Sequence, residues 1–470
     1  MRYVRWIPFE MKLKAPLKGR FAIPEPDTSQ VSGQVDFDVM KGIRLSTIDT
    51  FLRDPRALRR EHRWKCIHGF STNGRHLTLL NCRGHESMSQ PGFPEGQFWA
   101  THLLTGLHYF DISASSIKTI AFRLTNLDMW LNRSGVTIEV DPVEFGTFRA
   151  EHKHPGTIPL YKGDRFKLSI WHSTFTPLYQ GHDALKSFKE EAYLNVEYTE
   201  AASVEQATED ILMLRDLFSL WISAPIAVED VAVFIEGKMG DPKNRFELYF
   251  PLGYECTSIK GDSLHYMLYP FDDLEPTIND VIARWVTMYP RIKRGISFYH
   301  EAYFSKNRHA YQKFIDYAFS YESVNRALHP MTELPEENYV LLRKHITEGL
   351  AGEEHKFMVR VLKYANECSL RKRMKESFKR IGLSSEFDKD TIRRHVDRMV
   401  NARNGIVHDA MVNSEETVSD ENVVDYNTLL RILNVAELLL TIGLLEGGKP
   451  DRLKRDPLFA HFLGRRWSGL

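Results

Sequence analysis

The stretch NARNGIVHD, residues 401–409, follows a run of helical periodicity and places Arg403, Asn404 and His408 within six positions. On a helix that turns by about 100° per residue, residues four positions apart lie on one face, so Asn404 and His408 form a pair. Arg403 and His408 diverge by roughly 140° on the same helix. The long arginine side chain, or a looser turn at Gly405, must therefore bring the three groups together.

The sequence around this stretch is helical from Pro276 onward. Apolar residues recur there at helical spacing between short polar breaks, which predicts a bundle of helices. We expect helices at residues 277–288, 307–328, 336–349, 355–379, 388–404 and 422–445. This order places the 401–409 stretch at the end of one helix, with a polar loop and an apolar helix after it.

The first part of the chain is rich in strand signals. Asn73-Gly74 separates two runs of β-branched and apolar residues, which predicts a hairpin with a type I′ turn. We expect further strands at residues 99–110, 117–124, 165–171, 192–198, 231–235 and 246–250, and a helix at 204–220. The simplest architecture is an antiparallel sandwich-like or barrel-like sheet. We therefore predict a multidomain α+β protein, with a β-rich region at 1–275 and a helical bundle at 276–470.

The composition is that of a folded protein with more than one domain. The 470 residues are 43% hydrophobic, and Lys plus Arg equals Asp plus Glu at 62 each. The net charge therefore neither favours nor excludes nucleic acid. The four cysteines, Cys66, Cys82, Cys256 and Cys368, are scattered, and we find no apolar run long enough for a membrane span or a signal peptide. We expect a cytoplasmic protein with free thiols and no membrane partner.

The residues of the 401–409 stretch match the needs of RNA cleavage. Cleavage through the RNA's own 2′-hydroxyl needs a proton acceptor, a proton donor and positive charge on the transition state. A histidine such as His408 can serve as acid or base near neutral pH. Arg403 carries a fork of donors that fits phosphate oxygens, and Asn404 can hold the phosphate or fix the histidine tautomer. The alternative for the same residues is a capped, solvated helix end without a catalytic role.

Other chemistry is poorly supported by the sequence. There is no H-E-x-x-H motif, no paired C-x-x-C, no P-loop and no G-x-S-x-G element. His152 and His154 precede Pro155 and fit a loop better than a pair of metal ligands. We expect no metal and no cofactor.

Two basic clusters are candidates for contact with RNA. Arg371, Lys372, Arg373 and Lys375 lie on helical sequence before the 401–409 stretch, and we expect them to bind RNA. Residues 53–65 form another positive stretch, with arginines at 53, 56, 59, 60 and 63. For the first cluster the alternative is a solvated face, and the second could equally contact a partner or nothing.

The pattern R-N-x-x-x-H at 403–408 resembles the signature of HEPN domains (higher eukaryotes and prokaryotes nucleotide-binding). These are helical modules, and many of them are metal-independent ribonucleases. The order of helix, motif, polar loop and apolar helix is also that of HEPN modules. The predicted helix at 307–328 resembles the early HEPN helix that carries an acidic residue facing the active site, which makes Glu322 a candidate site member. Since most amphipathic helices contain a glutamate, Glu322 could equally be a surface or packing residue.

The N-terminal region resembles a narrower family. The stretches IHGF at 67–70, LTLLNC at 77–82 and FRLTNLDMW at 122–130 are similar to the N-terminal region of ApeA-type proteins. In that family a β-rich domain precedes a C-terminal HEPN domain, and the role is bacterial anti-phage defence. The resemblance covers essentially the whole chain.

The resemblance implies a metal-independent endoribonuclease of abortive infection, with Arg403, Asn404 and His408 as catalytic residues. The expected products are a 2′,3′-cyclic phosphate and a 5′-hydroxyl. One histidine cannot accept and donate a proton in the same step, and HEPN nucleases usually solve this with a homodimer whose two motifs face each other. We therefore expect a homodimer through the helical domain, RNA as substrate with tRNA as a candidate, and a phage-derived trigger. The alternative is a non-catalytic HEPN-like module for nucleotide binding or dimerisation.

Overall fold

The structure is a computed structural model that divides into two compact units, Met1–Ala283 and Arg284–Leu470. It describes residues 13, 15–26, 28–52, 60–88, 93–111, 117–140, 148–175, 189–235, 244–252, 264–305, 308–408, 420–445, 450–456, 459–460 and 462. The first unit is rich in strands and the second is helical, which confirms the predicted fold class. The division at Ala283 falls inside helix α4 (Ile278–Phe304), whereas the predicted one at 275 lies just before this helix.

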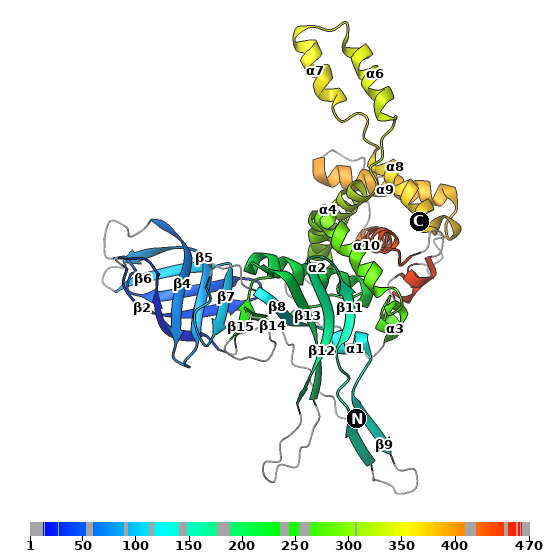
Figure 1. Cartoon of the computed structure of the whole chain (residues 1–470). Coiled ribbons are helices and arrows are strands. Elements are labelled where there is room, and N and C mark those ends of the chain that lie inside the picture. The colour runs from blue at the N-terminus through cyan, green and yellow to red at the C-terminus, as the bar shows by residue number, and fades with distance from the viewer. Residues whose placement is uncertain are drawn as a thin grey trace. The chain divides into compact units, whose positions relative to one another are not determined.

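Six strands of the first unit close into a barrel. Hydrogen bonds join them in the order β5-β4-β1-β2-β3-β6, and β6 pairs back onto β5, so that this part of the sheet has no free edge (Figure 1). All of these pairings are antiparallel. The barrel strands are β1 (Leu17–Ala22), β2 (Val31–Asp38), β3 (Gly42–Ile48), β4 (Glu61–Ser71), β5 (His76–Met88) and β6 (Pro94–Ala100).

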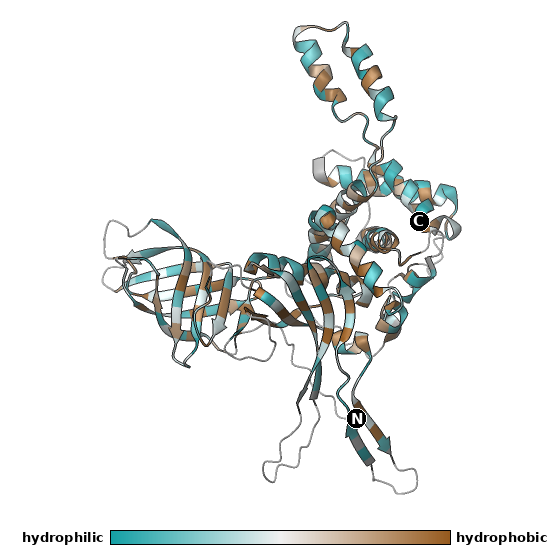
Figure 2. Ribbon diagram, viewed as in Figure 1, coloured by the Kyte–Doolittle hydropathy of each residue, from teal (hydrophilic) through white to brown (hydrophobic). Residues whose placement is uncertain are grey.

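The barrel forms because its strands alternate between buried apolar and exposed polar positions. Figure 2 shows this alternation along the barrel strands. Inward side chains fill the interior, among them Phe21, Leu45, Phe51, Trp64 and Phe98. A Cβ at the inward-facing Gly84 would lie 2.0 Å from the backbone oxygen of Gln97, so the strands approach too closely there for any side chain.

The sheet continues beyond the barrel through the first half of β5. β7 pairs with β5 at residues His76–Leu80, and six more strands follow in the order β15-β14-β8-β13-β12-β11. These strands are β7 (His102–Gly106), β8 (Ile117–Leu124), β11 (Ile158–Lys162), β12 (Phe166–Phe175), β13 (Lys189–Ala202), β14 (Val228–Phe234) and β15 (Arg245–Tyr249). A separate hairpin consists of β9 (Val136–Val140) and β10 (Phe148–His152).

Two helices accompany this sheet. Helix α2 (Val204–Ile222) contacts β8, and its first turn is capped by the Ser203 side chain, which accepts a hydrogen bond from the Gln206 amide at 3.1 Å. The predicted helix at 204–220 is therefore correct. The short α1 (Leu127–Leu131) contacts β13 and α3 (Phe271–Leu274).

The hairpin predicted at Asn73-Gly74 is present, but its turn type differs from the prediction. The Gly74 amide donates to the Ser71 carbonyl at 3.0 Å, and the Ser71 amide donates to the Arg75 carbonyl at 2.9 Å. Gly74 has a φ of 80°, while Asn73 is not among the residues with positive φ. This is a type I turn followed by a glycine bulge rather than a type I′ turn, which needs positive φ at both central residues.

The second unit is a bundle around α10, the helix seen nearly end-on within this unit in Figure 1. Described side chains are buried on nearly every face of α10, including Leu429, Leu430, Leu433, Ala436 and Leu439. The helices of this unit after α4 are α5 (Ala310–Leu328), α6 (Glu336–Thr347), α7 (Gly352–Leu362), α8 (Leu370–Ile381), α9 (Lys389–His408) and α10 (Asp420–Thr441).

The two largest differences in helix extent concern the predicted helices at 355–379 and 277–288. The predicted helix at 355–379 is two helices, because α7 ends at Leu362 and α8 begins after Ser369, whose hydroxyl accepts from the Lys372 amide. The predicted helix at 277–288 stops short, whereas α4 runs through Pro290 to Phe304. Apolar side chains of α4 are buried on both sides of this proline, and that packing outweighs the loss of one helical hydrogen bond.

Helices α6 and α7 form a hairpin with an apolar surface. Tyr339 and Leu362 are buried between them, and the tyrosine hydroxyl donates to the Leu362 carbonyl. Several other large apolar side chains of the hairpin are exposed, namely Val340, Leu341, Leu342, Phe357, Val361 and Tyr364. The described residues of the chain do not cover this surface.

Candidate functional site

The apolar stripe of α9 turns Arg403 toward the bundle. Ile392, Val396, Met399 and Val400 are buried on this helix, and their spacing of three and four residues defines one face. Arg403 continues the same face one turn later. Its side chain is accordingly only 21% exposed, although the end of the helix around it is polar.

Three residues hold the Arg403 guanidinium. Nη2 donates to Oε2 of Glu322 on α5 at 3.0 Å, and Nη1 donates to Oδ1 of Asn404 at 3.1 Å. The guanidinium carbon lies 5.6 Å from the centre of the Phe319 ring, within cation–π distance. Nε is buried and has no hydrogen-bond partner among the described residues. The arginine is thus fixed in place, and its buried Nε–H is left for an acceptor that these residues do not supply.

Glu322 is brought to the motif by the helical geometry of α5. Phe319 and Glu322 are three residues apart, so both lie on the side of α5 that meets α9. The Glu322 side chain is 19% exposed and also accepts from Nη2 of Arg326 at 2.9 Å. Glu322 therefore acts on Arg403 as a positioning residue, and Arg326 in turn positions Glu322.

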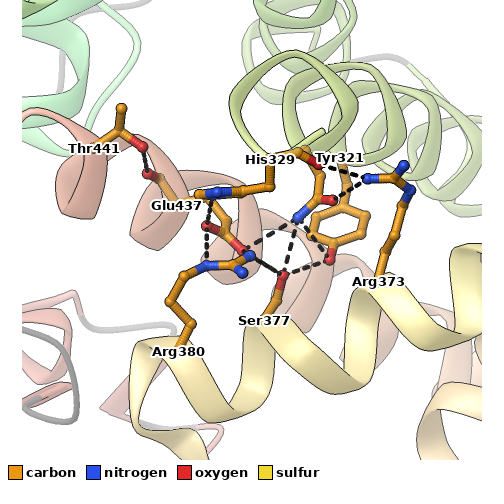
Figure 3. A network of polar contacts seen from close by, with 8 residues as sticks. Tyr321, His329, Arg373, Ser377, Arg380, Glu437 and Thr441 are labelled. Carbon is orange, nitrogen blue, oxygen red and sulfur yellow. Dashed lines mark hydrogen bonds and ion pairs between the residues drawn. The ribbon is translucent and has the colours of Figure 1, made fainter. Parts of the chain in front are cut away.

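A buried polar network locks α5 against α8 and α10 (Figure 3). At its centre is Glu437 of α10, whose side chain is 0% exposed. His329 contacts its Oε2 through Nε2 at 2.9 Å, Arg380 donates to the same oxygen at 3.1 Å, and Ser377 donates to Oε1. Asn325 of α5 donates to Oε1 as well, at 3.4 Å. One carboxylate thus joins three helices.

The network fixes the rotation of α5 about its own axis. Tyr321 and Asn325, which flank Glu322 on the helix, both contact the Ser377 hydroxyl, at 2.6 and 3.2 Å. If α5 rotated, these buried polar groups would lose their partners, which is costly in a low-dielectric interior. The direction of Glu322 toward α9 is therefore set by the buried contacts of two neighbouring residues on the same helix.

The carboxylate of Glu437 stays ionised in this interior. Burial alone would raise the pKa of Glu437, but hydrogen bonds from His329, Arg380 and Ser377 together outweigh burial and lower the pKa to about 2. The negative charge of Glu437 is then available at all ordinary pH values to hold the cationic side chain of Arg380.

The other two motif residues lie at the exposed end of α9. Asn404 is exposed, and its side chain accepts from Arg403. The predicted helix at 388–404 is one turn too short, because α9 extends to His408. Asn404 and His408 are therefore one helical turn apart on a continuous backbone, as the pairing requires. The His408 side chain lies outside the described part of the structure.

The basic cluster at 371–375 is divided by the structure. Arg371 contacts Asp397 at 2.6 Å, Lys372 contacts Glu333 at 2.6 Å, and both remain 43% exposed. Lys375 is half-buried. These three side chains lie at the surface of α8.

Arg373 departs from the prediction that it faces RNA. It is 4% exposed, and its guanidinium donates to the side chain of Asn325 and to the carbonyl oxygens of His329, Met331 and Cys368. The guanidinium therefore ties the end of α5 to α8 inside the bundle. The sequence pattern of α8 indicates this burial, because Arg373 shares the apolar face of Met374, Ser377 and Ile381.

The comparisons with known proteins cover both units. A family model described as ApeA N-terminal domain 1 matches residues 16–285, which is more than half of the chain. The chain belongs to the ApeA family. A second family model, described as Apea-like HEPN, matches residues 315–447 of this ApeA-type chain and includes every residue of the motif and Glu322. No curated protein and no solved structure gives a significant match.

Only some of the other features predicted for this ApeA-type chain involve residues that the structure describes. Cys66, Cys82 and Cys368 are free and buried, and Cys256 lies outside the described residues. Within the described ranges, no three His, Cys, Asp or Glu side chains group together as a metal site. No helix that the structure describes is long and apolar enough to cross a membrane.

The Glu322–Arg403 contact predicts a measurable coupling in this ApeA-type chain. In a double-mutant cycle of Glu322→Ala and Arg403→Ala, we expect a coupling free energy of about 1 kcal/mol, because both side chains are largely buried. Urea unfolding of the helical unit, followed by far-UV ellipticity, measures this energy. The exposed pair Glu353–Lys356, at 2.8 Å, is the matched control and should give a coupling near zero. Equal coupling in the two cycles would contradict a positioning role for Glu322.

Proposed function

We propose that the helical unit is a metal-independent endoribonuclease of HEPN type that acts in bacterial anti-phage defence by abortive infection. The observation that carries this proposal is the fixed Arg403 guanidinium, held by Glu322 and Asn404 one turn before His408. Membership of the ApeA family and the HEPN match supply the context.

Arg403 is suited to stabilise a phosphate in the transition state. A guanidinium whose position is set before the substrate arrives needs little reorganisation when charge develops on the phosphate oxygens. Its buried Nε–H lacks a partner among the described residues, which is consistent with a site that is completed by a ligand. Asn404, exposed beside it, can donate its amide N–H to a second phosphate oxygen.

His408 supplies the proton transfers. One imidazole removes the proton of the 2′-hydroxyl, whose oxygen attacks the adjacent phosphorus, and a second imidazole protonates the departing 5′-oxygen. The P–O5′ bond breaks as the P–O2′ bond forms, which leaves a 2′,3′-cyclic phosphate and a 5′-hydroxyl. Since each chain carries one such histidine in the motif, we propose a composite site made by two copies of the chain.

Single-stranded RNA is the class of substrate that this site would accept. Attack by the 2′-hydroxyl requires a flexible backbone, which exposed loops provide and rigid duplexes do not. The anticodon and other loops of tRNA meet this requirement, and we propose tRNA as the candidate substrate. Arg371, Lys372 and Lys375, on the surface of α8, are the proposed contacts to its backbone. In this proposal the β-rich unit responds to a phage-derived trigger.

The decisive experiment incubates the purified protein with total RNA in EDTA, with and without an extract of phage-infected cells. We expect cleavage that survives chelation and yields cyclic phosphate ends, and no cleavage by Arg403→Ala or His408→Ala. Cleavage retained by both variants, or abolished by EDTA and restored by added metal, would contradict the proposal.

One observation favours a second candidate function, a non-catalytic HEPN-like module for nucleotide binding or dimerisation. Arg403 is satisfied in part by contacts within its own chain, which a purely structural arginine would also make. This candidate predicts that nucleotides bind wild type and Arg403→Ala differently, while RNA stays intact with both proteins under every activating condition.

A further inference from the structure

A row of four side chains crosses the outside of the barrel in the β-rich unit. Arg63 on β4 is paired with Arg83 on β5, Arg83 is paired with Trp99 on β6, and Trp99 is paired with Arg44 on β3. The four residues therefore lie side by side on adjacent strands. Three spacings of about 4.8 Å give the row a length of roughly 14 Å.

All four side chains face solvent. The residues before and after each of them along its strand are buried or half-buried, and Trp99 itself is 38% exposed. No ring or cation–π contact of Trp99 is found within the part of the chain that the structure describes. The exposed part of the indole therefore lies in the row between Arg44 and Arg83.

The arrangement is unfavourable for the barrel alone. Like charges directly opposite each other on neighbouring strands destabilise a sheet, and Arg63 lies directly opposite Arg83. The exposed 38% of Trp99 adds no packing energy. An anion between the arginines and a flat apolar group on Trp99 would offset both costs.

Nearby acids only partly balance the row. Asp36 is paired with Arg44 across β2 and β3, and Glu61 contacts Arg63 at 3.3 Å with both side chains largely exposed. An exposed pair of this kind is weak and yields readily to a stronger anion. Lys65, also exposed and two residues after Arg63, extends the positive face along β4. Four cations, Arg44, Arg63, Lys65 and Arg83, thus lie near two carboxylates, and Arg63 and Lys65 belong to the basic stretch at 53–65.

We propose that this face of the barrel binds single-stranded nucleic acid, with the backbone phosphates on Arg44, Arg63 and Arg83 and one base stacked on Trp99. Alternation of cations with an exposed aromatic ring is the chemistry that binds unpaired strands, since every base has a flat face and every linkage a charge. A duplex buries the faces of its bases, and the side chains of an acidic polypeptide have no flat ring to stack on the indole. This site lies in the β-rich unit and involves none of the residues of the candidate active site.

The test is fluorescence anisotropy with the full-length protein and labelled single strands of about 16 nucleotides. One probe is a deoxyoligonucleotide and the other a 2′-O-methyl oligoribonucleotide, so that neither has the free 2′-hydroxyl needed for cleavage. Trp99→Ala should weaken binding by roughly 5- to 150-fold, and Trp99→Phe should restore most of it. Arg44→Ala combined with Arg83→Ala should reduce the slope of log K against log salt by about 1.4. The probe that binds more tightly shows whether the site prefers deoxyribose or a ribose-type sugar in the strand.

Control variants distinguish binding at this face from binding at the candidate nuclease site and from nonspecific attraction to positive charge. Lys167→Ala removes an exposed cation from β12 of the same unit and should leave binding unchanged. Arg403→Ala should not affect the Trp99-dependent part of binding, whether or not the chain proves to be a nuclease. Binding that is unaltered in Trp99→Ala, equal for duplex and single strand, or displaced by polyglutamate without dependence on Trp99 would overturn the proposal.

Discussion

Replacing His408 with alanine is expected to lower the rate of RNA cleavage by about 10²- to 10⁴-fold, the range that positioned acid–base groups contribute. Arg403→Ala should lower it by about 10²- to 10³-fold, because the fixed guanidinium supplies donors to the transition state. Arg403→Lys should recover little, since an ammonium cannot contact Glu322, Asn404 and a phosphate through one rigid fork. Single-turnover cleavage of a labelled RNA measures these rates.

Mixed dimers test whether two copies share one site. If each site needs a histidine from both chains, co-expression of wild type with an equal amount of His408→Ala leaves about one quarter of the activity rather than about one half. Differently tagged copies allow the mixed species to be isolated, and this species should be as inactive as the variant itself. A mixed dimer with half of the wild-type activity would instead indicate that each chain works alone.

The control for these variants comes from the same helix. Arg393 is the fifth residue of α9, where it is 66% exposed and contacts Asp390 at 3.4 Å. Arg393→Ala removes an arginine of α9 far from the motif, so cleavage should remain at the wild-type rate. A loss as large as that of Arg403→Ala would mean that the net charge of α9, rather than the geometry of the motif, is what matters.

The pairing of Glu322 with Arg403 shows what local patterns can predict. A short signature predicts the motif residues, and the resemblance of one amphipathic helix predicts Glu322. Helical periodicity predicts that α5 and α9 each bury one face. Glu322 and Arg403 lie on these two faces. Phe319 and Arg326, which complete the surroundings of the pair, lie one turn or less from Glu322 on the same helix, so a helical projection would have identified them.

Arg373 illustrates a prediction from charge alone that ignored periodicity. Four basic residues in a row of five suggested a solvated or RNA-binding face. On α8, however, Arg373 lies with Met374 and Ser377 on the buried side, and only the other three point outward. The partners of its guanidinium are mostly backbone carbonyl groups at the end of α5, which no sequence pattern brings near residue 373.

The row of Arg44, Arg63, Arg83 and Trp99 could not be predicted from the sequence, for a different reason. Its members come from four strands, and Arg44 is 55 positions from Trp99 along the chain. They become neighbours only through the register of three strand pairings, one of which closes β6 onto β5. A shift of one residue in any of these pairings would send a member of the row into the barrel interior.

Glu437→Gln is expected to be the most destabilising single change in the helical unit that leaves side-chain volume nearly unchanged. Glutamine fills the same space but leaves Arg380 without its buried counter-charge, and breaking such a pair costs roughly 3 kcal/mol. Since Arg380 is 25% exposed and partly solvated, we place the loss at this lower limit. Urea unfolding at neutral pH measures it. Glu376→Gln, which breaks an exposed contact with Lys379 on the same helix as Arg380, is the matched control and should cost far less.

The pH dependence of this change has a defined sign. Because the pKa of Glu437 is about 2 in the folded chain and near 4.5 when exposed, its stabilisation is complete above about 4.5 and is lost as the pH falls toward 2. The difference in stability between wild type and Glu437→Gln should therefore be constant from neutral pH down to about 4.5 and shrink below it. A difference that instead grows on acidification would mean that the glutamate is protonated in the native bundle. In that case a neutral side chain, and not a carboxylate, would be what holds α5 in the rotation that presents Glu322 to Arg403.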